Sequence, residues 1–487
     1  VKKFPGIPEY TYVSDIMASK HNENVVYAAF DNRKRDDFKP YLLVSNDKGE
    51  SWSSISSNLP NNVTVHTIQQ DHENPELLFA GTEFGAFFSI DGGKEWVQLK
   101  AGIPTISVRD MTIQERENDL VLATFGRGFY IIDDYSPLRE LADNKAILDE
   151  DAHMFEIPQA LMYIQTGGKY GQGAALYHSQ NPDFGAIFTF YLKDVPKTLK
   201  EIRKKAEKEL IKEKKPIPQP TIEELRKEEN EIKPYLLFTI MDNEGNVVRK
   251  ITKKPSKGIT RLNWDLRYDN PYPVRGNSKF NPLAESRGGM LAVPGTYKIK
   301  AELISRNGTE LLSEPKNFEA KILNNNTLPR EDLAATMEFN AKISELSRVM
   351  RGANEWVEES IEKIVKIQNT LLQSSAGTAE MLEKARKIEL ELRDILFEFE
   401  GPEARASWEE LDEIDMPLNR RLYSIVYNAW SSTQGITATM EQSYDILSDE
   451  FPPILERIKN VDEEIENLET HMEDSKIQWT PGRIPEL

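Results

Sequence analysis

The sequence contains no cysteine and only six histidines among its 487 residues. Without thiols the chain cannot form disulfides, thiolate nucleophiles or cysteine-ligated zinc and iron–sulfur sites. The histidines are scattered, and no two have the H-x-x-x-H spacing that places two imidazoles on one helix face. The sequence therefore predicts neither a metal site nor a resident cofactor.

Long apolar runs and an excess of positive charge are also lacking. No run of 18 or more apolar residues occurs, so we expect no membrane-spanning helix. The formal net charge is −19, which repels nucleic-acid phosphates and anionic membrane surfaces, so we expect neither as a partner. Hydrophobic residues make up 39% of the chain, enough for several cores, and its length predicts about three domains.

Two short segments repeat the pattern S-x-D-x-G-x-x-W at about 44 residues' separation, the length of a four-stranded propeller blade. Aspartate accepts hydrogen bonds within its own turn, and glycine adopts a positive φ angle at no steric cost. Tryptophan then packs between sheets. We assign a structural role to the residues of both turns: Ser45, Asp47, Gly49 and Trp52, and Ser89, Asp91, Gly93 and Trp96.

The strands around these turns repeat as well. Val65–Ile68 aligns with Val13–Ile16 and with Val108–Met111, and a degenerate third turn lies at Ile131–Asp134. The first unit is longer because of a polar loop at 31–38. Residues 1–137 are therefore predicted to be the last three blades of a β-propeller.

Three blades cannot close a propeller, which needs at least four. An open stack would leave strand edges exposed to aggregation. We therefore expect the first blade to pack against sheet that this chain does not supply. The partner blades would come from residues preceding Val1 in a longer precursor, or from another chain. The absence of an initial methionine agrees with this expectation.

The two turns, together with Phe79–Glu83 and Thr124–Phe129, resemble large sortilin-like proteins with bacterial neuraminidase (Asp-box) repeats. These secreted proteins are common in Bacteroidetes and are often labelled glycosyl hydrolases. The resemblance implies a long N-terminal propeller region and an extracytoplasmic location: periplasmic, cell-surface or secreted. Sialidases use an arginine triad, a tyrosine nucleophile and an acidic residue, and this set cannot be mapped onto the chain.

Residues 138–326 change to alternating strands with hairpin turns, which predicts an antiparallel β-sandwich of about 7 short strands. The turn at Asp242–Gly245, the strand at Asn263–Arg267 and the segment Val293–Tyr297 together resemble the immunoglobulin-like module of flagellar hook-cap proteins. A lysine- and glutamate-rich insertion at 196–232 contains a capping-box signature, Thr221 with Glu224, and predicts a helical hairpin. This hairpin is either a solvated excursion or a partner-docking arm. Trp264 is a core residue or a ligand platform.

Residues 327–475 follow a helical period, and four helices separated by short connections predict an up-down four-helix bundle. The expected helices cover about 333–372, 379–400, 417–432 and 437–472, followed by a tail at 476–487. A di-iron site in such a bundle would need Glu-x-x-His on two helices, and His471 is the only histidine here. The glutamates are therefore read as solvated helix faces.

No set of nucleophile, base and metal ligands can be recognised. We therefore expect a non-catalytic extracytoplasmic protein that binds a protein, peptide or glycan through its propeller. One alternative is a glycan-active hydrolase or lyase, a glycoside hydrolase of sialidase type, acting in the propeller channel. Another is a subunit of an envelope assembly. If a site exists in these blades, the candidates facing the channel are Glu83, Arg109, Asp110 and Arg127, although Arg127 could instead bridge neighbouring strands.

Overall fold

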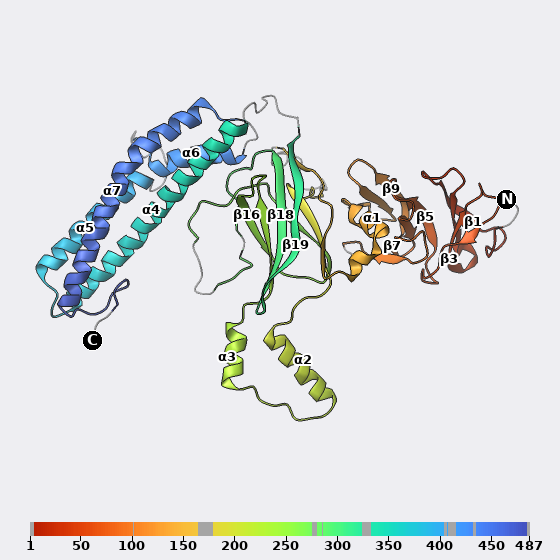
Figure 1. Ribbon diagram of the computed structural model, residues 1–487, viewed down its shortest axis with the longest axis horizontal. Coiled ribbons are helices and arrows are strands. Elements are labelled where there is room, and N and C mark those ends of the chain that lie inside the picture. The colour runs from red at the N-terminus through yellow and green to blue at the C-terminus, as the bar shows by residue number, and fades with distance from the viewer. Residues whose placement is uncertain are drawn as a thin grey trace.

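The computed structural model describes residues 4–100, 102–163, 179–274, 280–284, 286–323, 333–403, 407, 415–431 and 435–484. The described chain is a mixed β plus α structure with five sheets and seven α-helices. Figure 1 shows three regions in a row: small sheets at the N-terminal end, larger sheets in the middle and long helices at the C-terminal end.

The N-terminal region consists of three antiparallel sheets, each built from consecutive strands. The first sheet contains β1 (Tyr12–Ala18), β2 (Val26–Asn32), β3 (Asp37–Ser45) and β4 (Ser53–Ser54). The second contains β5 (Val65–Gln70), β6 (Leu78–Thr82), β7 (Gly85–Ser89) and β8 (Val97–Leu99). The third contains β9 (Val108–Gln114), β10 (Asp119–Thr124) and β11 (Phe129–Ile132).

The second sheet is covered on both faces, which explains why β5, β6 and β7 are almost entirely buried. One face packs against the first sheet through Leu42 and Ile68, and the other packs against the third sheet through Phe79 and Leu122. Because β11 leads directly into helix α1 (Ser136–Asp143), the third sheet has three strands in the described chain.

The two S-x-D-x-G-x-x-W segments make their polar contacts mainly within their own turns. The Ser45 hydroxyl donates to Asp47 at 2.8 Å and accepts from the N–H of Gly49 at 2.8 Å. The second turn repeats this pattern around Ser89. Trp96 differs because its indole N–H donates to the carbonyl of Ile55 in the neighbouring sheet at 2.7 Å, and its side chain is buried between the two sheets.

The middle region is built from two sheets that share one aromatic core. One sheet has the order β12 (Ala152–Met154), β14 (Ala186–Leu192) and β17 (Gly258–Trp264). The other has the order β13 (Ala160–Met162), β19 (Gly308–Ile322), β18 (Gly295–Ser305), β15 (Tyr235–Met241) and β16 (Val247–Lys253). Trp264 is fully buried against Tyr297 and Phe318 and is therefore a core residue.

Two details of the middle region differ from the sequence-based expectation. Strand β13 pairs in parallel with β19, so the arrangement is not wholly antiparallel. Strands β12 and β13, which the alternation did not indicate, are only three residues long. Such short strands carry too few residues for alternation to be recognised, which is why they were missed.

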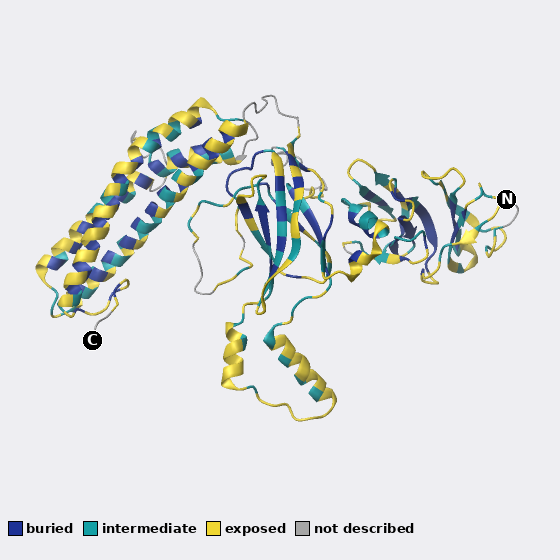
Figure 2. Cartoon of the chain, viewed as in Figure 1, coloured by how far each residue is buried: buried dark blue, intermediate teal, exposed yellow. Residues whose placement is uncertain are grey.

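The inserted hairpin consists of α2 (Leu199–Lys212) and α3 (Ile222–Asn230), and it projects away from the sheets (Figure 1). Thr221 and Glu224 form the expected capping box, and a second capping box at Thr198 begins α2. Neither helix buries a residue, as the mostly exposed hairpin in Figure 2 shows. The two helices are joined by a bidentate ion pair between Arg203 and Glu228, with bonds of 2.6 and 2.8 Å.

The C-terminal region contains α4 (Leu333–Gln373), α5 (Ala379–Glu400), α6 (Leu418–Ser431) and α7 (Ala438–Asp474). Helices α4 and α7 run in the same direction, because Phe339 contacts Tyr444 near their starts and Lys363 bonds Glu469 at 2.9 Å near their ends. The expected up-down packing of four helices is therefore wrong for this pair.

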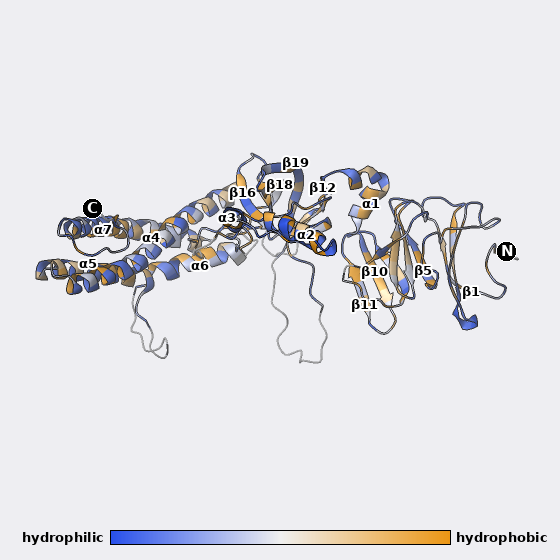
Figure 3. Ribbon diagram, turned by 90° about the horizontal axis from the view of Figure 1, so that it is seen from below, coloured by the Kyte–Doolittle hydropathy of each residue, from blue (hydrophilic) through white to orange (hydrophobic). Residues whose placement is uncertain are grey.

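Helices α5 and α6 lie end to end and together form the third rod of the bundle (Figure 3). Along α4, Gln368 contacts Glu389 of α5, whereas Asn354 contacts Asn419 of α6. The reason is length. At 1.5 Å per residue α4 extends about 60 Å, and the 22 residues of α5 with the 14 of α6 extend about 54 Å together.

The segment after α7 packs back onto the bundle. Arg483 is buried and donates to Glu473 at 2.8 Å, and Thr480 is also buried. Within the described chain, no helix is both long and apolar enough to cross a membrane.

Candidate functional site

The loops that join the strands of the three N-terminal sheets gather at two opposite ends. Strands β1 and β5 run in the same direction, since Ser14 bonds the carbonyl of Val65 at 3.0 Å and Ser19 bonds Gln70 at 2.7 Å. Strand β9 follows β5 in the same sense. Strands β1, β5 and β9 all begin at one end of the sheets, and we name this end the loop face. The β2–β3, β6–β7 and β10–β11 turns also lie there.

A carboxylate at the end of β6 is the centre of a polar cluster on the loop face. Oε2 of Glu83 accepts hydrogen bonds from Arg33 at 2.6 Å, from His66 at 2.8 Å and from the hydroxyl of Ser107 at 3.3 Å. A guanidinium nitrogen of Arg109 lies 3.5 Å from the same oxygen. Three successive sheets therefore converge on one carboxylate, which we call the Glu83 cluster.

Arg33 extends the cluster to a second carboxylate. Its guanidinium makes a bidentate contact with Asp31, with Nε at 3.1 Å and Nη2 at 2.9 Å. Asp31 thereby holds the Arg33 side chain in the position from which it reaches Glu83. The result is a chain of alternating charges that links the first sheet to the second.

Protonation in the Glu83 cluster is fixed by these contacts. Burial would raise the pKa of Glu83, but the hydrogen bond from His66 and the charges of Arg33 and Arg109 lower it below its ordinary value. Burial, together with the two arginines, lowers the pKa of His66. At neutral pH the cluster therefore holds an ionised glutamate and a neutral imidazole.

These contacts limit the chemistry available to Glu83. A general acid needs a raised pKa so that it carries a proton at the working pH, whereas the pKa of Glu83 is lowered. The strength of a general base rises with its pKa, so the lowered pKa and the three donors on Oε2 make this carboxylate a weak base. The geometry suits a structural anchor that holds two arginines and a histidine in place.

The four candidates drawn from the sequence are divided by the structure. Glu83 and Arg109 meet in the cluster. Asp110 is exposed and accepts a hydrogen bond from the next backbone N–H, that of Met111, at 2.8 Å. Arg127 is exposed in the β10–β11 turn, and its side chain makes no hydrogen bond or ion pair with the described residues.

Four members of the cluster were not identified from the sequence: His66, Ser107, Asp31 and Arg33. His66 occupies the same repeat position as Arg109 and Ser14, so the strand alignment contained the signal that could have found it. Asp31 and Arg33 belong to the loop that was read as an insertion, which the alignment leaves without counterparts. The repeats therefore indicate where the inner strands converge, but not which loop residues meet there.

Exposed aromatic side chains lie on the loop face together with the Glu83 cluster. Phe125 is 70% exposed and lies under the guanidinium of Arg109, 5.3 Å from it. Tyr12 and Phe84 begin or follow strands at the same end and are 69% and 42% exposed. Aromatic faces beside arginines are the composition that recurs at the energetic centres of protein interfaces.

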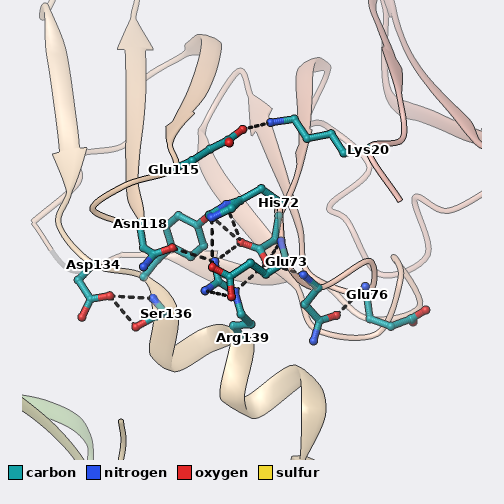
Figure 4. A network of polar contacts seen from close by, with 12 residues as sticks. Lys20, His72, Glu73, Glu76, Glu115, Asn118, Asp134, Ser136 and Arg139 are labelled. Atoms are coloured by element: carbon teal, nitrogen blue, oxygen red, sulfur yellow. Dashed lines mark hydrogen bonds and ion pairs between the residues drawn. The ribbon is translucent and has the colours of Figure 1, made fainter. Parts of the chain in front are cut away.

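The opposite end of the sheets carries a second polar network, drawn in Figure 4. Asp71, which is fully buried, accepts two hydrogen bonds from Arg139 of α1, both at 2.8 Å, and one from the Tyr135 hydroxyl at 2.7 Å. Arg139 also donates to Asn118 at 2.9 Å and pairs with Glu73 at 3.0 Å. We call this the Asp71 clamp. It fastens α1 to the second and third sheets.

No group of three or more histidine, aspartate or glutamate side chains is arranged to hold a metal ion in the described ranges. The negative charges of both networks are instead neutralised by arginines.

No protein-family model and no curated protein matches the chain. Among solved structures it is similar to an ancestral GH74 enzyme, with 26% identity, coverage of 24% of this chain and 14% of that chain, and a TM-score of 0.21. The GH74 xyloglucanase from Xanthomonas campestris is 15% identical, and the match has a TM-score of 0.17. It covers 21% of this chain and 17% of that chain.

The extracellular domain of a one component system from B. thetaiotaomicron is 12% identical to this chain. The match covers 64% of this chain and 31% of that domain, with a TM-score of 0.19. The chain thus spans less than a third of each of these structures. Similarities this distant assign neither a family nor an activity.

Proposed function

We propose that the loop face binds a protein or peptide ligand without catalysis, and that the chain acts outside the cytoplasm as a sortilin-like propeller protein. The observation that carries this proposal is the composition of the loop face. Exposed Tyr12, Phe84 and Phe125 lie at the same end of the sheets as the guanidinium groups that Glu83 holds in place, and Phe125 contacts that of Arg109. Rigid aromatic and arginine side chains lose little conformational entropy when a partner covers them.

The state of Glu83 supports binding over hydrolysis. A sialidase-like site would place a tyrosine–glutamate pair opposite an arginine triad. Here two arginines contact Glu83, and no tyrosine hydroxyl in the described part of the chain donates to it. The lowered pKa of Glu83 also removes it as an acid catalyst at neutral pH. A glycan-active hydrolase remains the competing function, and the experiment below includes it.

We further propose that the three sheets are blades of a propeller that other blades complete, either from a longer precursor or from a separate polypeptide. The support is the outer face of the third sheet. Phe129 and Ile131 of β11 are 75% and 58% exposed, and they pair across the sheet with Ala123 and Val121. Cross-strand partners share a face, so the part of this face formed by β10 and β11 is apolar and faces away from the second sheet.

The proposal is tested by peptide selection on the intact chain, followed by affinity measurement on a double variant, Phe84→Ala with Phe125→Ala. We expect the affinity for selected peptides to fall at least tenfold. Phe397→Ala on α5 is the matched control, because that side chain is 52% exposed and distant from the loop face. Unchanged affinity in the double variant would remove the loop face as the binding site.

The hydrolase alternative is tested on the same preparation with xyloglucan and a sialylated trisaccharide. We expect no product above the level of the buffer blank. Turnover that disappears in Glu83→Gln and persists in Asp110→Asn would establish catalysis at the cluster and overturn the proposal.

A further inference from the structure

A large cavity lies between the middle sheets and the C-terminal helices, far from the loop face. Its volume is about 1130 Å³. The walls come from the edge strand β16, from residues between 269 and 274 and residues 284, 286 and 287 after β17, from the middle of α4 and from the start of α6. Both neighbouring regions therefore contribute to one site.

Four cationic side chains line this cavity: Arg249, Lys250, Arg287 and Arg351. None of them forms an ion pair with a described carboxylate, although Asp269 and Glu355 also line the cavity. The smaller hollow on the other side of Tyr272 differs. There Arg348 is paired with Glu345 at 2.6 Å.

Two of the four cations are held rigidly by the fold. Arg249 is only 6% exposed and donates to the carbonyls of Arg287 at 3.0 Å and Ser286 at 2.8 Å, while its Nε has no hydrogen-bond partner. The guanidinium of Arg351 stacks over the ring of Tyr272 at 3.6 Å. Burial lowers the pKa of Arg351.

Charge balance makes this arrangement unusual. The chain as a whole has 61 basic and 80 acidic residues, so carboxylates to pair with these cations are abundant. A partly buried guanidinium without a counterion, such as that of Arg351, is unfavourable, and arginine forks match oxyanions in a bidentate geometry. An anion entering the cavity would be bound by charges that are already in place.

We propose that this cavity binds a small organic anion through its carboxylate, sulfate or phosphate groups, with Lys250, Arg287 and Arg351 as the main contacts. The volume exceeds what a single inorganic oxyanion fills and suits a ligand of sugar size. Lys250 and Arg287 belong to the middle region and Arg351 to α4. The bound anion therefore joins the two regions, adding to the stack of Arg267 on Trp430 at 3.8 Å.

Calorimetric titration of the intact chain with sulfate, phosphate, citrate and a sulfated uronate disaccharide tests this proposal. Comparing the four probes shows whether the cavity prefers a sulfate, a phosphate or a carboxylate group. We expect saturable binding of at least one probe. In the double variant Lys250→Gln with Arg287→Gln, we expect the Kd to rise at least tenfold. Both side chains are exposed, so their replacement leaves the fold intact.

The matched control is Arg116→Gln with Lys321→Gln, which removes the same charge elsewhere on the surface. An equal loss of affinity in this control would show that the loss depends only on net charge, and it would overturn the proposal. If none of the probes binds saturably, the proposal is also overturned. Hydrogen exchange provides the location. Binding should slow exchange at 247–250 and in the middle of α4, and protection confined to other segments would place the site elsewhere.

Discussion

Replacing the buried carboxylate of the Asp71 clamp should destabilise the N-terminal sheets more than any single surface change. Asp71 is fully buried and receives three side-chain hydrogen bonds, two of them from Arg139. In Asp71→Asn the guanidinium of Arg139 loses its buried counterion and keeps only the ion pair with the exposed Glu73. Removing one partner of a buried ion pair costs about 3–5 kcal/mol, because the remaining charge is left uncompensated.

The dependence of stability on pH provides a second estimate of the clamp. Burial would raise the pKa of Asp71, but the hydrogen bonds from Arg139 and Tyr135 lower it from its usual 3.8 to about 2. This difference corresponds to about 2 kcal/mol of stability at neutral pH. Because the folded pKa is the lower one, the contribution is complete above pH 4 and is lost as the pH falls toward 2.

Hydrogen–deuterium exchange is the appropriate assay, because it reports the N-terminal sheets separately from the helices. Exchange at 65–82 and 108–143 should accelerate in Asp71→Asn by the factor that corresponds to 3–5 kcal/mol, on the order of 10² or more. The control is Asp194→Asn, whose carboxylate is 80% exposed and pairs with Lys257 on the surface. Similar exchange in the two variants would refute the clamp as a structural element.

Three further changes test the packing of the other regions. Trp96→Ala should cost about 3–5 kcal/mol by opening a cavity between the first two sheets, measured by urea unfolding, whereas Trp96→Phe should cost less. Gly185→Ala should prevent normal packing of the middle sheets, because the new Cβ would lie 1.9 Å from the carbonyl oxygen of Trp264 at a φ of +124°; loss of near-ultraviolet dichroism would report it. Arg203→Ala should accelerate proteolysis of the exposed hairpin without changing the unfolding of the sheets, because Arg203 joins α2 to α3 through Glu228.

The repeat period made much of the strand order accessible from the sequence. Aligned strands such as Val65–Ile68 and Val108–Met111 each begin a sheet in the structure, because local hydrophobic alternation fixes strand position and face. The contacts of the Asp71 clamp could not be predicted from the repeat pattern. Asp71 and Arg139 are separated by more than one repeat, and nothing in the local sequence of either residue indicates the other.

Helix packing shows a different limit. The bounds of α5 and α6 followed from periodicity and from the terminator at Gly401, but their end-to-end arrangement depends on the length of α4. A helix of 14 residues cannot cover a helix of 41, so two short helices in series bury more of the apolar stripe than two side by side. Comparing helix lengths in the sequence would have predicted this arrangement.

The two candidate sites differ in how their arginines are neutralised, and this difference separates their roles. In the Glu83 cluster the guanidinium of Arg33 is satisfied by carboxylates on adjacent sheets, so what the loop face offers a partner is shape and aromatic surface. In the cavity beside β16, Arg287 and Arg351 have no carboxylate partner in the described residues, so the cavity offers charge. A ligand of the loop face should therefore bind with weak dependence on salt. An anion in the cavity should lose affinity steeply as ionic strength rises, because screening acts on charges that the protein leaves unpaired.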